Sequence, residues 1–260
     1  MQPVSEAKSL FVWHELMTTD IPAAISFYTK VVGWEIEAST DVPGYQMWKV
    51  PGKTTVGGVF DLPEDAKKMG AIPNWMGNIC VEDIDASVTK LQALGGQVYK
   101  AAFDIPNIGR VAIAADPTGA SFALYQPSGS APGHSGRGGV GEFSWCELST
   151  SDPEAAWAFY SELLGWKKTD AMDMGPMGTY QMFSGPSGGT IGGMMRRPPE
   201  MPVSAWGFYV SVSNMDGAIE TAIGRGAKLL HGPADVPGGD VIANLIDPQG
   251  AFFSLHARKE

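Results

Sequence analysis

The sequence predicts a protein of the α+β class, built from four βαβββ modules that form two tandem domains. The first observation is a repeat: residues 11–34 recur as residues 143–166, with 12 of the 24 aligned positions identical at a constant offset of 132. The second is that a strand-like segment, a helix-like segment and three further strand-like segments follow one another in each copy. A repeat of this length and order indicates one structural module that has been duplicated.

The first module begins with a short strand over residues 10–17. Successive side chains of a strand point to opposite faces, so Trp13 and Glu15 share one face, while His14 lies on the other, where buried packing is expected. Asp20 is a typical N-cap for the helix that follows. Three further strands are predicted over residues 34–37, 45–50 and 55–60.

A second, more divergent module follows the first. A strand over residues 75–81 precedes a helix whose apolar residues recur at helical spacing and which stops at Gly95-Gly96. Three strands complete the module, and the last two are joined by an Asp-Pro-Thr-Gly turn at residues 116–119. The whole pattern recurs from Glu142, where the equivalent turn is Asp-Pro-Gln-Gly at residues 247–250.

A segment rich in glycine, serine and proline separates the two halves. Residues 127–141 contain six glycines and have the composition of a flexible linker. We therefore expect an N-terminal domain over residues 1–126 and a C-terminal domain over residues 142–260.

Composition restricts the possible partners. The formal net charge of −10 argues against nucleic acid or an anionic membrane. Two cysteines, Cys80 and Cys146, exclude a disulfide scaffold, and neither has the spacing of a zinc site. No segment has the apolar run of a signal peptide or a membrane span, so a cytoplasmic protein is expected. We expect a small-molecule ligand and a monomer or homodimer.

The chain resembles the vicinal oxygen chelate superfamily, which includes glyoxalase I, bleomycin-resistance proteins, fosfomycin-resistance enzymes and extradiol dioxygenases. The resemblance is carried by the FYTKVVGW and FYSELLGW helix ends, the glycines that close the second helix of each half, and the two DPxG turns. With W-x-E-L in the first strand, the tandem form is most similar to a bacterial glyoxalase-like subgroup typified by a mycobacterial culture-filtrate antigen and often labelled as hydroxylases. The resemblance implies cup-shaped mixed sheets, with the helices outside and the ligand site inside.

In metal-using members of this superfamily, the ligands come from the first strand of each module and from a late strand. Here those positions fall on Trp13, Trp145, Met76, Gly207, Ala123 and Ser254. None of these residues offers an imidazole, carboxylate or thiolate donor to a divalent cation. We therefore expect no metal cofactor at the customary positions.

Trp13 and Glu15 would face the inside of the cup, and Trp145 and Glu147 hold the equivalent positions in the second half. An aromatic ring beside a carboxylate suits a planar or cationic organic ligand. Either glutamate is also a candidate general base. The alternative is that the tryptophans fill space and the glutamates pair with a neighbouring strand.

His256 is a further candidate for catalysis. It shares the inward face of its strand with Ser254, and a Glu147–His256 pair would form an acid–base couple. A hydrogen-bonded structural histidine is the alternative. The expected ligand-binding residues are Trp13, Trp145, Met76, Tyr209 and Tyr125, the last being the counterpart of His256 in the first half.

Three functions remain open from the sequence. The first is a metal-free protein that binds a small aromatic or cationic molecule, as bleomycin-resistance proteins do. The second is an enzyme of lyase, isomerase or hydroxylase type that uses Glu147 and His256, with Glu15 as a further catalytic candidate. The third is a metal-dependent glyoxalase or dioxygenase whose ligands lie elsewhere.

Overall fold

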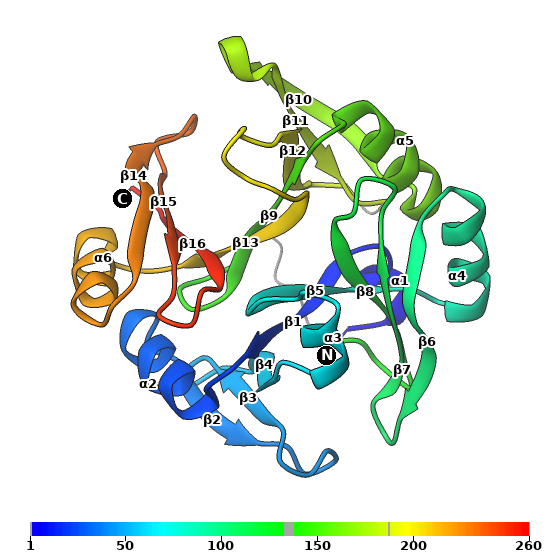
Figure 1. Ribbon diagram of the computed structural model, residues 1–260, viewed down its shortest axis with the longest axis horizontal. Helices are drawn as coiled ribbons and strands as arrows, with labels where there is room; N and C mark the ends of the chain where they lie inside the picture. The colour runs from blue at the N-terminus through cyan, green and yellow to red at the C-terminus, as the bar shows by residue number, and fades with distance from the viewer. Residues whose placement is uncertain (1, 133–137, 187, 260) are drawn as a thin grey trace. The chain divides into compact units, whose positions relative to one another are not determined.

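The computed structural model describes residues 2–132, 138–186 and 188–259 (Figure 1). The first half contains α1 (Val4–Ala7), β1 (Phe11–Thr18), α2 (Ile21–Val31), β2 (Glu35–Ala38), β3 (Gln46–Lys49), β4 (Thr55–Asp61), α3 (Glu64–Lys68), β5 (Asn74–Cys80), α4 (Ile84–Ala93), β6 (Gln97–Ile105), β7 (Gly109–Ala115) and β8 (Ser121–Pro127). The second half contains β9 (Phe143–Thr150), α5 (Pro153–Leu164), β10 (Lys167–Asp173), η1 (Gly175–Met177), β11 (Thr179–Ser184), β12 (Thr190–Arg196), β13 (Ala205–Ser211), α6 (Met215–Gly224), β14 (Lys228–Asp235), β15 (Val241–Ile246) and β16 (Phe252–Ala257).

The strands form two eight-stranded mixed sheets with helices outside them, which confirms the predicted α+β class. The strand order is β2-β3-β4-β1-β5-β8-β7-β6 in one sheet and β10-β11-β12-β9-β13-β16-β15-β14 in the other (Figure 1). Strand β1 runs parallel to β4 and β5 runs parallel to β8, whereas the hairpins within each module are antiparallel. No helix in the described part of the chain is long and apolar enough to cross a membrane.

The short helices α1 and α3 were not predicted. Helix α3 contains no buried residue, so the sequence has no apolar periodicity that would reveal it. Part of the predicted linker, residues 133–137, lies outside the described residues. The domain boundaries at residues 126 and 142 stay predictions.

The chain divides into two compact units, and each unit joins segments that are distant in the sequence. Unit 1 comprises Met1–Trp13, Gly77–Gly136 and Cys146–Gly207, and unit 2 comprises His14–Met76, Arg137–Trp145 and Phe208–Glu260. In unit 1 helix α4 contacts α5, and in unit 2 helix α2 contacts α6. Each unit therefore combines modules from both halves of the chain.

The long helices all begin with the same kind of cap. Asp20 accepts a hydrogen bond from the Ala23 amide at 2.9 Å, as the sequence predicted for the start of α2. The equivalent caps of α4, α5 and α6 are Asp83, Asp152 and Asn214. Each cap satisfies one of the amides that a helix start leaves without an intrahelical partner.

Tyr28 of α2 lies in the core of unit 2 and links two other buried groups. Its hydroxyl accepts a hydrogen bond from Trp75 Nε1 at 3.0 Å and donates one to Asp247 Oδ2 at 3.0 Å. The other carboxylate oxygen of Asp247 accepts the amides of Gln249 and Ala251, which holds the Asp-Pro-Gln-Gly turn. The Tyr of the repeated FY motif and the Asp of the DPxG motif thus meet in one buried contact.

Unit 1 repeats much of this arrangement with other residues. Trp206 Nε1 donates to the Tyr160 hydroxyl at 2.9 Å, and Asp116 Oδ1 accepts the Thr118 amide at 2.8 Å. The closing Gly-Trp of each repeat is also explained. Trp166 Nε1 donates to a carbonyl in unit 1, that of Ser9, while its counterpart Trp34 donates to the carbonyl of Gly141 in unit 2.

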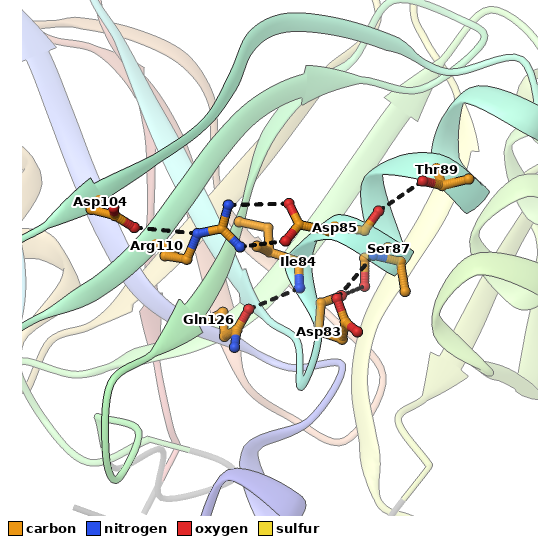
Figure 2. A network of polar contacts seen from close by, with 9 residues as sticks. Asp83, Ile84, Asp85, Ser87, Thr89, Asp104, Arg110 and Gln126 are labelled. Carbon is orange, nitrogen blue, oxygen red and sulfur yellow. Dashed lines mark hydrogen bonds and ion pairs between the residues drawn. The ribbon is translucent and has the colours of Figure 1, made fainter.

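Exposed polar contacts attach the start of α4 to the sheet (Figure 2). Arg110 donates to both carboxylate oxygens of Asp85, at 2.6 and 3.1 Å, and its Nε lies 3.3 Å from Asp104. These hydrogen bonds lower the pKa of the Asp85 carboxyl. Beside them Gln126 Oε1 accepts the Ile84 amide at 3.0 Å. Solvent screens an exposed ion pair, so the network orients the helix more than it stabilises the fold.

Candidate functional site

The first strand of each half has the predicted alternation. Trp13 and Glu15 in β1 are partly exposed, as are Trp145 and Glu147 in β9, whereas the residue between each pair is buried. The two tryptophans and two glutamates therefore share the more accessible face of their strands, which is where a ligand would contact them.

The opposite face of these strands is packed, as predicted. His14 is buried, and its ring stacks on Phe143 with a centroid distance of 3.7 Å and meets the edge of Phe208. Burial raises the pKa of the Cys146 thiol, and it raises the pKa of Cys80 to about 11. Neither cysteine has the lowered pKa of a reactive thiol.

Each glutamate is bonded to a tyrosine that the sequence analysis did not single out. The Tyr45 hydroxyl donates to Glu15 Oε1 at 2.8 Å in unit 2, and the Tyr180 hydroxyl donates to Glu147 Oε2 at 3.0 Å in unit 1. We call these contacts the carboxylate–phenol pairs. The one available signal was the recurrence of Tyr-Gln-Met at residues 45–47 and 180–182.

A glycine beside each glutamate makes room for the phenol. Strand register places Gly58 opposite Glu15 and Gly193 opposite Glu147. A Cβ atom on either glycine would collide with the ring of the tyrosine in its pair. The Val-Gly-Gly-Val and Ile-Gly-Gly-Met sequences therefore have a steric role, since any larger residue at the second glycine would displace the phenol from its carboxylate.

His256 has partners other than the predicted one. Its Nδ1 lies 2.9 Å from Ser144 Oγ and 3.4 Å from Ser211 Oγ, and its Nε2 lies 2.9 Å from Asp240 Oδ2. All of these residues belong to unit 2, whereas Glu147 belongs to unit 1. The predicted Glu147–His256 couple stays a prediction.

The remaining ligand-binding candidates are largely buried. Met76, Tyr125 and Tyr209 are less than one-tenth exposed. The Tyr125 hydroxyl donates to the Ile108 carbonyl at 3.0 Å, and burial raises its pKa to about 12. Tyr125 is therefore a neutral hydrogen-bond donor at physiological pH. Its contribution to ligand binding stays a prediction.

One face of the last module is more polar than the same face of the second module at the five positions compared. Cross-strand pairing places Tyr209 and Asn244 beside Ser254, and Ser211 beside His256, so these five side chains share one face of β13, β15 and β16. The same pairing in the first half gives the counterparts Asn78, Ile113, Ala123, Cys80 and Tyr125. The second half thus replaces Ile and Ala by Asn and Ser at adjacent positions.

The residues at the customary metal-ligand positions do not fit a divalent cation. They provide indole, thioether, methyl and hydroxyl groups or no side chain at all, and Ser254 has a single hydroxyl that is fully buried. Within the described ranges, no group of three or more His, Cys, Asp or Glu side chains is arranged to hold a metal ion. No chemical step at these positions is therefore derived through a metal.

Two curated proteins resemble this chain along almost their whole length. It is 35% identical over 250 residues to "Putative glyoxylase CFP32" of Mycobacterium bovis, covering 94% of this chain and 92% of that protein. It is 30% identical over 264 residues to the anthracycline biosynthesis protein DauV of Streptomyces sp., covering 95% and 93%.

Solved structures share the fold at low sequence identity. The Mn(II)-bound glyoxalase of Novosphingobium aromaticivorans superposes with a TM-score of 0.66 at 18% identity, covering 98% of this chain and 83% of that one. The 2,3-dioxygenase LapB of Pseudomonas sp. superposes with a TM-score of 0.64 at 13% identity, covering 95% and 91%. The sequence model of one superfamily matches both halves, at residues 10–124 and 142–255. The chain therefore belongs to the Glyoxalase/Bleomycin resistance protein/Dioxygenase superfamily.

Proposed function

We propose that this protein binds a small organic molecule at the two carboxylate–phenol pairs, Glu15–Tyr45 and Glu147–Tyr180. The observation that carries the proposal is repetition: the same carboxylate, phenol and adjacent glycine occur once in each unit. Many combinations of residues could fill the same space if only packing were required. A carboxylate beside a phenol and a partly exposed indole is a more specific combination, and it offers both charge and an aromatic surface to a ligand. The superfamily and the printed names of the relatives are in keeping with a small-molecule ligand.

The pairs suit a planar ligand that carries a cationic or hydrogen-bond-donating group. The carboxylate attracts such a group, and the phenol orients the carboxylate by donating to one oxygen. Trp13 and Trp145 share the accessible face of the same strands, where an indole ring can stack on a planar molecule.

A thermal-shift screen of planar and cationic metabolites tests this proposal. A ligand that binds the native state raises the melting temperature by mass action. We expect Glu15→Gln and Glu147→Gln each to weaken the shift, and the double variant to abolish it. Glu37→Gln is the matched control, because Glu37 is an exposed strand residue whose carboxylate forms an ion pair with Lys49. A shift that survives the double variant at wild-type size would refute the proposal.

Catalysis is the second candidate, and the contacts of His256 favour it. An imidazole that is hydrogen-bonded at both ring nitrogens has a fixed orientation, as an acid–base group requires. If a substrate is found, we expect Glu147→Gln to abolish turnover in a protein that still folds. Turnover by that variant at the parent rate would contradict the role of Glu147.

Metal analysis separates both candidates from a metal-dependent glyoxalase or dioxygenase. Protein purified without chelator and then dialysed is expected to retain no stoichiometric manganese, iron, nickel or zinc. Retention of one such ion per chain would mean that the ligands lie at positions other than the customary ones.

A further inference from the structure

Two buried oxygen atoms on neighbouring strands have no hydrogen-bond partner among the described residues. They are Oγ of Ser254 on β16 and Oδ1 of Asn244 on β15, and these two residues are direct cross-strand partners. Ser254 is fully buried. Buried polar groups in native proteins are almost always hydrogen-bonded, and an unpaired one lowers stability, so two adjacent ones require an explanation.

The two groups differ in what they can offer. The carbonyl oxygen of an asparagine only accepts hydrogen bonds, whereas a serine hydroxyl can donate one. Because they lie opposite each other on one face, they complement a group that has a donor beside an acceptor. A primary carboxamide has this pattern: its N–H would donate to Asn244 and its carbonyl would accept from Ser254. A carboxylate lacks the donor and would place negative charge against the Asn244 oxygen.

The neighbouring side chains form a fixed polar wall. His256 lies two residues along β16 on the same face as Ser254. Ser144 Oγ lies 2.9 Å from one ring nitrogen of His256, and Asp240 Oδ2 lies 2.9 Å from the other. A charged carboxylate at Nε2 favours the tautomer with the proton on that nitrogen, which leaves Nδ1 as the acceptor of the Ser144 hydroxyl proton. The side chains of His256 and Asp240 are 14% and 30% exposed, so this wall reaches the surface.

The first half of the chain supplies an internal comparison. The positions equivalent to Asn244 and Ser254 hold Ile113 and Ala123, which are again cross-strand partners. An apolar pair is therefore compatible with this module, and packing alone does not require the polar pair.

We propose that the face formed by Asn244, Ser254 and His256 binds the primary carboxamide group of a small molecule. All three residues belong to unit 2, and none of them is a member of a carboxylate–phenol pair, so the ligand of this face need not be the ligand of the pairs.

The test compares two probes of the same shape, benzamide and benzoate, by saturation-transfer NMR with the full-length chain. We expect benzamide to bind with a Kd of at most about 10 mM, and we expect the Kd of benzoate to be higher. Ser254→Ala and Asn244→Ala are each expected to weaken benzamide binding about three- to tenfold, the value of one hydrogen bond. Asp235→Asn is the control, since Asp235 is exposed on β14 and pairs with Lys259.

The melting temperature without ligand gives a second, independent readout. Removing an unpaired buried hydroxyl is neutral or stabilising, so Ser254→Ala is expected to melt at or above the wild-type temperature while it loses benzamide affinity. The proposal is overturned if benzoate binds as well as benzamide, if benzamide does not bind, or if Ser254→Ala binds it like the wild type. A lowered melting temperature for Ser254→Ala would also overturn it, because Ser254 would then have a structural partner.

Discussion

Replacement of Tyr28 by phenylalanine tests whether the buried contact between the FY and DPxG motifs stabilises unit 2. The side chain is 1% exposed, and its hydroxyl links Trp75 Nε1 to Asp247 Oδ2. Phenylalanine has nearly the same shape, so the substitution removes two hydrogen bonds and leaves the aromatic packing around the ring in place.

The expected loss can be worked out from these two contacts. An indole N–H and a carboxylate oxygen would each remain buried without this partner, at a cost of about 1–3 kcal/mol each. We therefore expect Tyr28→Phe to lower the free energy of unfolding by about 2–6 kcal/mol, against a typical total of about 5–15 kcal/mol. The carboxylate places the estimate towards its upper end.

The assay is urea unfolding at pH 7, followed by tryptophan fluorescence and circular dichroism together. Tyr99→Phe is the matched control, because Tyr99 is 42% exposed and its loss should change stability by less than about 0.5 kcal/mol. A double variant with Trp75→Phe removes the indole donor as well. Since that donor is no longer left unpaired, the two substitutions together should cost less than the sum of the single effects.

Two results would refute this reasoning. A loss below about 1 kcal/mol for Tyr28→Phe would show that water or a local shift replaces both hydrogen bonds. Strict additivity of Tyr28→Phe and Trp75→Phe would show that the two side chains are not coupled.

Three further predictions concern pH, thiol reactivity and the glycine beside a carboxylate–phenol pair. Burial raises the pKa of the Asp247 carboxyl, so the native state binds the carboxyl proton more tightly than the unfolded state does. The stability gained from this proton is fully present below the pKa of the unfolded state. It is lost as the pH rises through the raised pKa of the native state. The difference in urea midpoint between wild type and Asp247→Asn should therefore change with pH over this acidic window, and a constant difference would contradict the assignment. The raised pKa of the fully buried Cys80 lowers its thiolate fraction about a hundredfold, and the pKa of Cys146 is raised as well. Both thiols should therefore react with Ellman's reagent far more slowly in native than in denatured protein. Rapid labelling of the native protein would show that the thiols are accessible. Gly58→Ala should displace Tyr45 and cost about 1–3 kcal/mol, with loss of any ligand-induced thermal shift in that unit, whereas an unchanged shift would show that the phenol is not required.

Local patterns in the sequence were sufficient to predict the long helices and the direction of the side chains in the first strand of each half. Asp20 could be identified as an N-cap because its side chain bonds to an amide only three residues further along the chain. The burial of His14 followed from the period of a strand. Both features depend on neighbours along the chain, and both are confirmed.

Contacts between segments that are distant in the sequence could not be predicted from such local patterns. The register that places Tyr45 beside Glu15 depends on which strands pair, and a shift of one residue would turn the side chain to the other face. Asp240 lies in a Gly-Gly-Asp turn, and nothing in that turn indicates that its carboxylate meets His256. Ser254 was noticed for its position, but that its hydroxyl has no hydrogen-bond partner among the described residues depends on the surrounding side chains.

The composition of the two units has a consequence for biosynthesis. Residues 14–76 leave the ribosome long before residues 208–260, yet both belong to unit 2, where Tyr28 bonds to Asp247 across 219 positions of the chain. Unit 2 therefore cannot be completed until translation is nearly finished, and the aromatic side chains of residues 14–76 lack their native contacts with residues 208–260 until then. If the chain were divided at its sequence repeat, neither fragment could form a complete unit. We therefore expect the two fragments to be poorly soluble apart and to recover native structure when they are refolded together.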